Sequence, residues 1–260
     1  MDLELRGRIA IVNGASQGIG LGIASVLASE GAQVVMTARR EPALQEAVQA
    51  LSIRTGNAGL FPVVGDIRRA EDCERIANEA VRLCGGVHIL VNNDGAPPLG
   101  ASADFDDPAW QKAIDQNFFS VIRMTRAVVP HMRRAGGGSI TNIIAGSVLS
   151  PRSGYGLSVA TWAAVVGFAK TLSIELGPDR ITVNNVAPGA IRTSRVQKIA
   201  ERLGQTEDSL LADIVKDVPV GRIGTVDDIA NMVALLSSNR GSYVTGTTIR
   251  IDGGMLRNLI

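Results

Sequence analysis

The regular alternation of short apolar runs with longer stretches of helical periodicity most constrains the fold of this chain. Runs rich in β-branched residues are typical of buried strands, and the segments between them repeat apolar residues at helical spacing. The seven runs are Ile9–Val12, Val34–Thr37, Leu60–Val64, Ile89–Asn92, Ile140–Ile144, Thr182–Val186 and Thr248–Ile251. The clearest helical stretches are Ile19–Ser29, Pro42–Leu51, Cys73–Leu83 and Trp110–Met132. Alternating strands and helices build βαβ units, so we expect an α/β fold with a Rossmann-type, doubly wound parallel sheet.

Length and composition fit one globular domain. The chain has 260 residues, a formal net charge of +1 and 45% hydrophobic residues, with no linker-like stretch that would divide it. We therefore expect a single domain over residues 1–260. Charges of both signs are dispersed, so we expect no basic surface of the kind that binds nucleic acid.

The sequence gives no sign of an export, membrane or metal-binding segment. Residues 1–6 lack the basic-then-apolar order of a signal peptide, and no apolar run approaches the roughly 20 residues that span a bilayer. We expect a cytoplasmic protein with no membrane partner. The two histidines and two cysteines do not have the spacing of metal ligands, so no metal site is expected.

The first strand runs directly into a glycine-rich turn that opens a helix. Gly14 permits a tight turn, Gly18 lets the backbone approach a pyrophosphate, and Gly20 allows the helix to pack closely on the strand. This context favours a dinucleotide site over the alternative, a glycine turn that has no ligand. The predicted contacts of the turn are Gly14, Ser16, Gln17, Gly18, Ile19 and Gly20.

Arg39, at the end of the second strand, indicates which dinucleotide is bound. An NAD-selective site would present a carboxylate to the ribose there, whereas Arg39 can form paired hydrogen bonds with a 2′-phosphate, so NADP(H) is favoured over NAD(H). The alternative is that Arg39 is a solvated residue at a helix start. Asp66 and Ile67 close the third strand beside the adenine position; the Asp66 carboxylate would accept from the adenine amino group or else cap a helix.

Further motifs follow in a fixed order: Asn92–Gly95, Asn117, Asn184–Gly189, and the pair Val244–Gly246 and Asp252–Gly254. Together with the glycine turn they resemble the short-chain dehydrogenase/reductase family, particularly its 3-oxoacyl-carrier-protein reductase-like branch. The resemblance covers essentially the whole chain. It implies a structural and catalytic role for Asn117. It also implies cofactor contacts at Asn92, Gly95, Pro188, Gly189, Ile191 and Thr193.

The same resemblance shows what this chain lacks. The family's chemistry resides in Ser, Tyr and Lys with the spacing Ser-x12-Tyr-x3-Lys, and here those positions are Ala145, Ser158 and Trp162. In the family the lysine cation lowers the phenol pKa from about 10, so that the phenol exchanges a proton near neutral pH. A serine hydroxyl is a much weaker acid and an indole carries no charge. We expect that the usual proton relay cannot operate.

Other residues near these positions leave alternatives open. Tyr155, one helical turn earlier, could act as a compensating acid or only line the mouth of the pocket, and Ser158 could be a weak donor or a helix cap. Asp94 stands where the family has a small Ala, so it could repel a phosphate or pair with Arg39. The indole of Trp162 could occupy the space of the nicotinamide ribose.

Three functions follow from these observations. The first is an NADP(H)-dependent oxidoreductase that acts on a carbonyl or alcohol, with a small-molecule or acyl-carrier substrate. The second is a catalytically inactive nucleotide-binding or scaffolding protein, and the third is a non-redox enzyme that uses the same crevice. The polar, helix-prone segment 192–218 is predicted to be a substrate lid. Resemblance to the family also implies a homo-oligomer, a tetramer or dimer.

Overall fold

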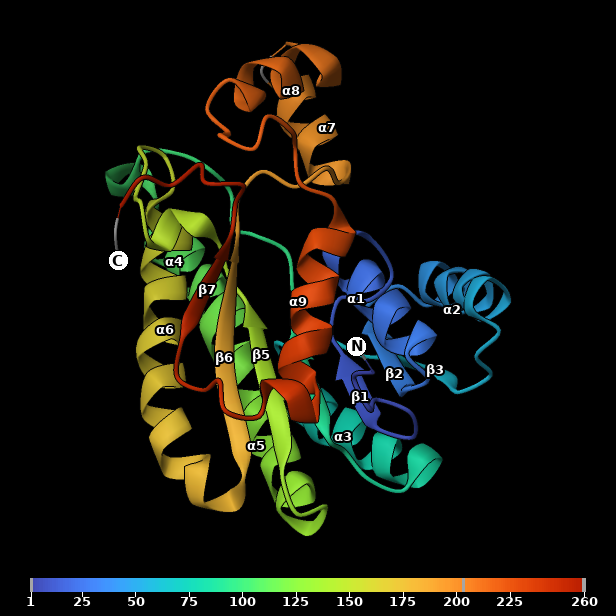
Figure 1. The fold of residues 1–260 in the computed structure, drawn as a ribbon. Helices are drawn as coiled ribbons and strands as arrows, with labels where there is room; N and C mark the ends of the chain where they lie inside the picture. Colours follow the sequence, from blue (N-terminus) through green and yellow to red (C-terminus); the bar gives the residue numbers. More distant parts are fainter. Residues whose placement is uncertain (1, 203, 259–260) are drawn as a thin grey trace.

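A computed structural model describes residues 2–202 and 204–258 of the chain, so Leu203 of the predicted lid and the ends of the predicted domain lie outside the described residues. The described residues form one parallel sheet of seven strands with helices on both faces (Figure 1). The strands are β1 Ile9–Val12, β2 Gln33–Ala38, β3 Leu60–Val64, β4 Ile89–Asn92, β5 Gly138–Ile143, β6 Ile181–Pro188 and β7 Thr248–Ile251. Each predicted strand is present, with its ends displaced by at most two residues.

The order of the strands places a crevice at the middle of the sheet. The order is β3-β2-β1-β4-β5-β6-β7, and all neighbouring strands are parallel. The chain builds outward from β1 to β3 and then returns to the other side of β1 to add β4. Ligands of such sheets bind outside the carboxyl ends of the strands at this reversal, which here lies between β1 and β4.

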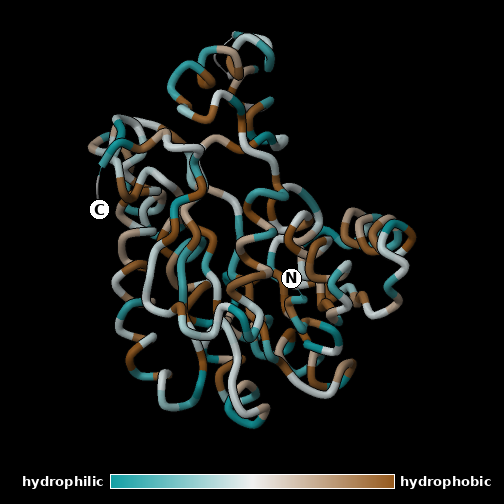
Figure 2. Tube along the Cα trace, viewed as in Figure 1, coloured by the Kyte–Doolittle hydropathy of each residue, from teal (hydrophilic) through white to brown (hydrophobic). Residues whose placement is uncertain are grey.

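Two layers of helices cover the sheet. The helices are α1 Gly18–Ser29, α2 Glu41–Thr55, α3 Ala70–Cys84, α4 Asp107–Ile114, α5 Ser120–Arg134, α6 Gly156–Leu176, α7 Ser194–Arg202, α8 Glu207–Val215 and α9 Val226–Ser237. The core against one face includes residues of α1, α2 and α9, and the core against the other includes residues of α3, α5 and α6. In β1, Ala10 and Val12 face the first core and Ile11 the second, so both faces are buried. Figure 2 shows brown, apolar stretches along the sheet and on the helices that cover it, interrupted by teal, polar ones. The predicted single-domain Rossmann-type fold is confirmed.

The single helix predicted for Trp110–Met132 is wrong in its middle. The structure has α4, then a π-helical segment over Asp115–Phe119, then α5. A π-helical turn holds one residue more than an α-helical turn, so it shifts the faces of the helices before and after it. Apolar periodicity on either side still resembles one helix, which is why the sequence concealed the change.

The prediction that no segment is long and apolar enough to span a bilayer is wrong for Gly156–Asp179, which is α6 with the turn after it. In the fold, this helix packs on the sheet through buried residues such as Trp162, Val165 and Ala169. Its exposed side carries small residues in its first half, which are Ala160, Ala163, Ala164 and Gly167, and two charges nearer its end, Lys170 and Glu175. With only these two charges, a core helix of this fold is as long and apolar as a membrane-spanning helix.

The segment predicted to be a lid forms α7 and α8. These two helices stand beyond the carboxyl ends of the strands, outside the two layers that cover the sheet (Figure 1). They are therefore on the side of the sheet where the crevice opens.

Candidate functional site

The glycine turn after β1 is tightly packed at two of its glycines and open at the third. Gly14 and Gly18 have positive φ angles of 62° and 58°. A Cβ on Gly20 would lie 2.3 Å from the Gly14 carbonyl oxygen, and one on Gly14 would lie 2.7 Å from Asn93 Nδ2. A Cβ on Gly18 would meet only Thr193 Cγ2, at 3.9 Å. The turn thus leaves room at Gly18, between the start of α1 and the segment before α7.

The first turn of α1 has the properties of an anion site. Gln17 precedes the helix in an extended conformation without a side-chain cap, and the first turn has no acidic residue. The first N–H groups of a helix lack intrahelical partners and carry the positive end of the helix dipole. With Ser16 and Ile19 in the same turn, this backbone suits a pyrophosphate.

A row of hydrogen-bonded polar side chains crosses the sheet below the turn. It runs through β2, the end of β1, β4, β5, β6 and β7, with donor–acceptor distances of 2.9 to 3.2 Å, as Thr37, Asn13, Asn92, Asn142, Asn185 and Thr248. Each amide donates to the side chain on the next strand, so buried polar groups are paired. Asn13 bonds to the side chains of Thr37 on β2 and Asn92 on β4. The sequence did not single out Asn142 or assign this role to Asn185, although an Asn in each of three successive strands was the available signal.

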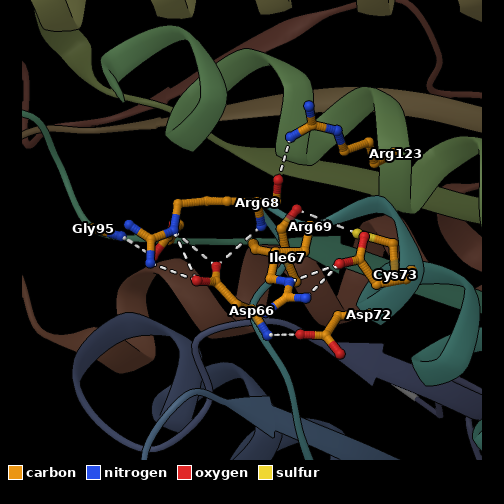
Figure 3. A network of polar contacts seen from close by, with 10 residues as sticks. Asp66, Ile67, Arg68, Arg69, Asp72, Cys73, Gly95 and Arg123 are labelled. Carbon is orange, nitrogen blue, oxygen red and sulfur yellow. Dashed lines mark hydrogen bonds and ion pairs between the residues drawn. The ribbon is translucent and has the colours of Figure 1, made fainter. Parts of the chain in front are cut away.

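Charged side chains gather where an adenosine would lie, outside β2, β3 and β4. Arg68 forms paired contacts with Asp66, Nε to Oδ1 at 2.8 Å and Nη2 to Oδ2 at 2.5 Å (Figure 3). These bonds lower the pKa of Asp66, and Arg39 lowers it further. Both oxygens of Asp66 are thus engaged by Arg68, a pairing that the sequence did not predict. An adenine amino group would therefore share this carboxylate with the guanidinium.

Asp94 lies in the same charged group. Its Oδ1 accepts a hydrogen bond of 2.7 Å from the Gly95 N–H. Burial raises the pKa of Asp94, while that hydrogen bond and the nearby cations Arg39 and Arg68 lower it, in that order of size. The structure places Asp94 within electrostatic reach of Arg39 without a direct ion pair between their side chains among the described residues. The carboxylate therefore lies close to where a 2′-phosphate would sit on Arg39.

The segment after β6 forms the opposite wall of the crevice. The Gly189 N–H donates to Ile251 O at 2.9 Å, and a Cβ on Gly189 would lie 2.7 Å from that of Asp252. Ile191 then pairs with Gly224 in an isolated bridge. These contacts, beginning at the end of β6 in Pro188, direct the chain to Thr193, which faces Gly18.

The positions of the missing relay lie beside an apolar cluster. Trp162 is only 4% exposed and packs in a core with Val121, Ile144, Val165 and Ala187, against which Ala145 also packs. Ser158, one turn earlier on α6, is likewise 4% exposed. The indole thus takes a structural place in the core, and no cation stands at this position to lower the pKa of a neighbouring hydroxyl.

Asn117 is held by α6 from within the π-helical segment. Its Nδ2 donates to Thr161 Oγ1 at 2.8 Å, and the residue is fully buried. Its Oδ1 has no hydrogen-bond partner among the described residues, and neither has the buried Oγ of Ser147 in the turn after β5. Buried polar atoms without partners are uncommon, so these two sites are suited to a water or a ligand.

Tyr155 lies at the start of α6, one helical turn before Ser158. It is the residue before α6, is half-buried, and pairs with Gly100 in an isolated bridge. Arg195 of α7 is close enough to interact electrostatically with it: burial lowers the pKa of Arg195 and Tyr155 raises it. The Arg195 guanidinium of the lid segment is thus within electrostatic reach of the Tyr155 phenol. Among residues 2–202 and 204–258, no group of three or more His, Cys, Asp or Glu is arranged to hold a metal ion.

Comparison with known proteins covers nearly the whole chain. A family profile described as enoyl-(acyl carrier protein) reductase matches residues 14–256. Dehydrogenase/reductase SDR family member 4 of Oryctolagus cuniculus is 36% identical over 96% of this chain and 94% of its own length. The 3-oxoacyl-[acyl-carrier-protein] reductase of Chlamydia muridarum is 34% identical over 98% and 100%.

Solved structures agree with this fold. L-sorbose reductase from Gluconobacter frateurii, complexed with NADPH and L-sorbose, has a TM-score of 0.95 at 32% identity and covers 100% of both chains. An NADPH-bound short chain oxidoreductase from Pseudomonas aeruginosa, described as containing an atypical catalytic center, has a TM-score of 0.90 at 28% identity. It covers 96% of this chain and 97% of its own.

Proposed function

Because the chain belongs to the short-chain dehydrogenase/reductase family, we propose that it is an NADP(H)-dependent oxidoreductase whose proton transfer does not use the family's Ser-Tyr-Lys relay. Its relatives and structural neighbours are oxidoreductases, which supports the reaction class. The observation that carries the proposal is the retained glycine turn, open at Gly18 and followed by an uncapped helix.

The residues of the crevice fit a phosphorylated dinucleotide. The pyrophosphate would lie at the first N–H groups of α1, beside Gly18. Arg39, at the end of β2, would pair with a 2′-phosphate, and two structural neighbours are NADPH-bound proteins. Asn92, Gly95, Ile67 and the Pro188–Thr193 segment would line the remaining length of the cofactor.

NADPH, when bound, supplies a hydride to an electrophilic carbon such as that of a carbonyl group. The protein then has to deliver a proton to the carbonyl oxygen. Ala145 offers no hydrogen bond there, so the Ser158 hydroxyl or the Tyr155 phenol would donate it. Loss of efficient acid catalysis costs about a hundredfold to ten-thousandfold in rate, while proximity alone still supplies several kcal/mol. We therefore expect slow turnover.

The substrate is proposed to be a small carbonyl or alcohol, including a 3-oxoacyl thioester. The Arg195 guanidinium and the Tyr155 phenol, two hydrogen-bond donors, favour a substrate that carries an oxygen-rich or anionic group. Helices α7 and α8 would act as its lid. We place this reaction in the cytoplasm, with no nucleic-acid or membrane partner.

A second candidate function is a nucleotide-binding scaffold without turnover. The burial of Trp162 at the Lys position favours it, because this side chain stabilises the core instead of the reaction. The small exposed residues Ala160, Ala163, Ala164 and Gly167 of α6 are suited to close packing against a second copy of the chain, as a dimer or tetramer. Such an assembly is compatible with either function.

Titration with NADPH and NADH tests nucleotide binding, which both functions require. We expect micromolar binding of NADPH and weaker binding of NADH, measured by nucleotide fluorescence or calorimetry. The control is Gly18→Asp, because Asp tolerates a positive φ, has room at this position and places a negative charge beside the pyrophosphate. No binding of either nucleotide to the wild-type protein would refute the oxidoreductase function. Binding without oxidation of NADPH by any carbonyl substrate would favour the scaffold.

A further inference from the structure

Arg123 of α5 connects two parts of the site that are distant in the sequence. One nitrogen of its guanidinium, Nη1, donates to the Arg68 carbonyl oxygen. The other, Nη2, donates to Asp115 Oδ1 at 3.1 Å, and the guanidinium lies 4.9 Å from the centre of the Phe119 ring. Figure 3 shows Arg123 reaching from its helix to the Asp66–Arg69 turn.

The first partner of Arg123 belongs to the adenosine pocket. The turn after β3 is fixed by its own bonds: the Asp66 N–H donates to Asp72 Oδ2 at 2.9 Å, and the Arg68 N–H donates to Asp66 Oδ1 at 3.1 Å. The Arg68 side chain closes on Asp66 in the same turn. A change in the position of Asp66 or Arg68 would therefore move the carbonyl that Arg123 contacts.

The second partner begins the turn that carries Asn117. Asp115 is the first residue of the π-helical segment, and its second oxygen accepts from Gln111 Nε2 at 3.0 Å. Asn117, two residues on, is fixed from the other side by Thr161. The segment is thus held between α6 and Arg123, and π-helical turns depend on such contacts because they interrupt regular helical hydrogen bonding.

The ion pair between Arg123 and Asp115 is partly shielded from solvent. The Arg123 side chain is 22% exposed and that of Asp115 is 33% exposed, so the pair is screened less than a surface ion pair. Both ends of the link also line one depression of about 570 Å³, between the Asp66–Arg69 turn and α4. A planar guanidinium with donors pointing in two directions can make both contacts at once, which an ammonium group cannot do with the same geometry.

We propose that Arg123 is a positioning residue that couples occupancy of the adenosine pocket to the orientation of Asn117. An adenosine whose amino group engages the Asp66 carboxylate, with its 2′-phosphate on Arg39, would fix the turn that carries the Arg68 carbonyl, and through Arg123 it would order the π-helical segment. The inference rests on the proposed function, because it assumes that this pocket receives the adenosine end of NADP(H).

Hydrogen exchange with 2′,5′-ADP as ligand tests the coupling, because this compound has the adenosine end of the cofactor and no nicotinamide. In the wild-type protein, saturating 2′,5′-ADP is expected to slow amide exchange in residues 115–119 by about fivefold, the low end of measured coupling energies. In Arg123→Ala, the same ligand should bind and protect residues 66–69 while exchange in 115–119 no longer responds. Asp115→Asn should give the same result while leaving the Arg68 contact in place.

The control is Arg126→Ala, which removes the same charge from an exposed position one turn along α5 and should preserve the response. Arg123→Lys keeps the charge and should restore little of the exchange response in residues 115–119. The coupling is refuted if 2′,5′-ADP binds but leaves residues 115–119 unchanged in the wild type, or if the response survives in Arg123→Ala. A response lost equally in Arg126→Ala would refute it as well. Absence of binding of both 2′,5′-ADP and NADPH to the wild type would instead refute the proposed function, and the coupling with it.

Discussion

The two halves of the crevice differ in how much of their polar chemistry they retain. The half formed by β1, α1 and the end of β2 has a glycine turn open at Gly18, an uncapped helix start and Arg39. In the half formed by the end of β5 and α6, Ala145 packs against an apolar core that includes Trp162, and Trp162 stands four residues after Ser158 where the family has its lysine. Holding a dinucleotide requires backbone N–H groups and a positive charge, whereas moving a proton near neutral pH requires a titratable group with a shifted pKa. A fold can therefore keep the residues that hold a dinucleotide while losing the residues that move a proton.

The largest expected effect concerns the apolar half. Trp162→Ala should lower the free energy of unfolding by about 3–5 kcal/mol, because it leaves a cavity among Val121, Ile144 and Val165. Urea unfolding measures this change, and NADPH affinity of the folded variant should change little. A variant as stable as the wild type that oxidises NADPH faster would break the comparison, since the indole would then obstruct the reaction instead of supporting the core.

In the binding half, Gly20→Ala should abolish most NADPH affinity. Its Cβ would lie 2.3 Å from the Gly14 carbonyl oxygen, and overpacking of this kind costs about 1–3 kcal/mol. Gly167→Ala is the matched control on a helix, because its Cβ would meet nothing within 4 Å. That change should stabilise the protein by about 0.5–1 kcal/mol and leave affinity unchanged. Calorimetric titration and thermal unfolding of both variants make the measurement; equal affinities would contradict the close packing of the turn.

Asp94→Asn sharpens the comparison within the binding half. Removing a negative charge near Arg39 should raise NADPH affinity about threefold to tenfold, with NADH affinity nearly constant because NADH lacks the 2′-phosphate. Because burial raises the pKa of Asp94, its carboxyl takes up a proton above the usual carboxyl range as the pH falls. The advantage of the variant should therefore shrink as the pH falls, beginning above the range in which ordinary carboxyl groups titrate. Glu30→Gln, an exposed change of the same charge at the far end of α1, is the control. Weaker NADPH binding in the variant would show that Asp94 assists the cofactor.

The smallest expected effect concerns α9, the helix that supports the binding half. Asp228 completes a capping box with Thr225, and Arg222 contacts it at 2.7 Å; these bonds lower the pKa of Asp228. A carboxyl with a depressed pKa stabilises the fold above its unfolded pKa, and that stabilisation disappears as the pH falls through the folded value. Asp228→Asn should cost about 1 kcal/mol at pH 7 and progressively less below about pH 4. Thermal unfolding across pH measures this; a cost that grows with acidification would contradict the assignment.

The sheet and the glycine turn could be predicted because their signals are local. Each strand is a short apolar run rich in β-branched residues, and the first helix begins within the glycine turn at Gly18, so a short window of sequence is enough to predict each of them. The layers then follow, because right-handed crossovers allow few ways to cover a parallel sheet.

The polar contacts of the candidate site could be predicted only in part. Asp66 and Asn117 were identified by position, but their partners Arg68 and Thr161 were not. Arg123 contacts a carbonyl 55 residues away, and the wider turn at Asn117 leaves the apolar pattern nearly unchanged. Such contacts depend on the packing of α5 against the turn after β3, which no periodicity specifies.

The row of amides below the crevice has a single direction, since each side chain donates toward β7 and accepts from the β2 side. Turning one amide over would set oxygen against oxygen on one side and NH₂ against NH₂ on the other, so these side chains cannot reorient one at a time. An aspartate at Asn142 would have no proton to give Asn185 and would interrupt the row at its centre. If this crevice is transplanted into another protein, the amides must therefore be transferred together, because the row is lost when any one of them is left out.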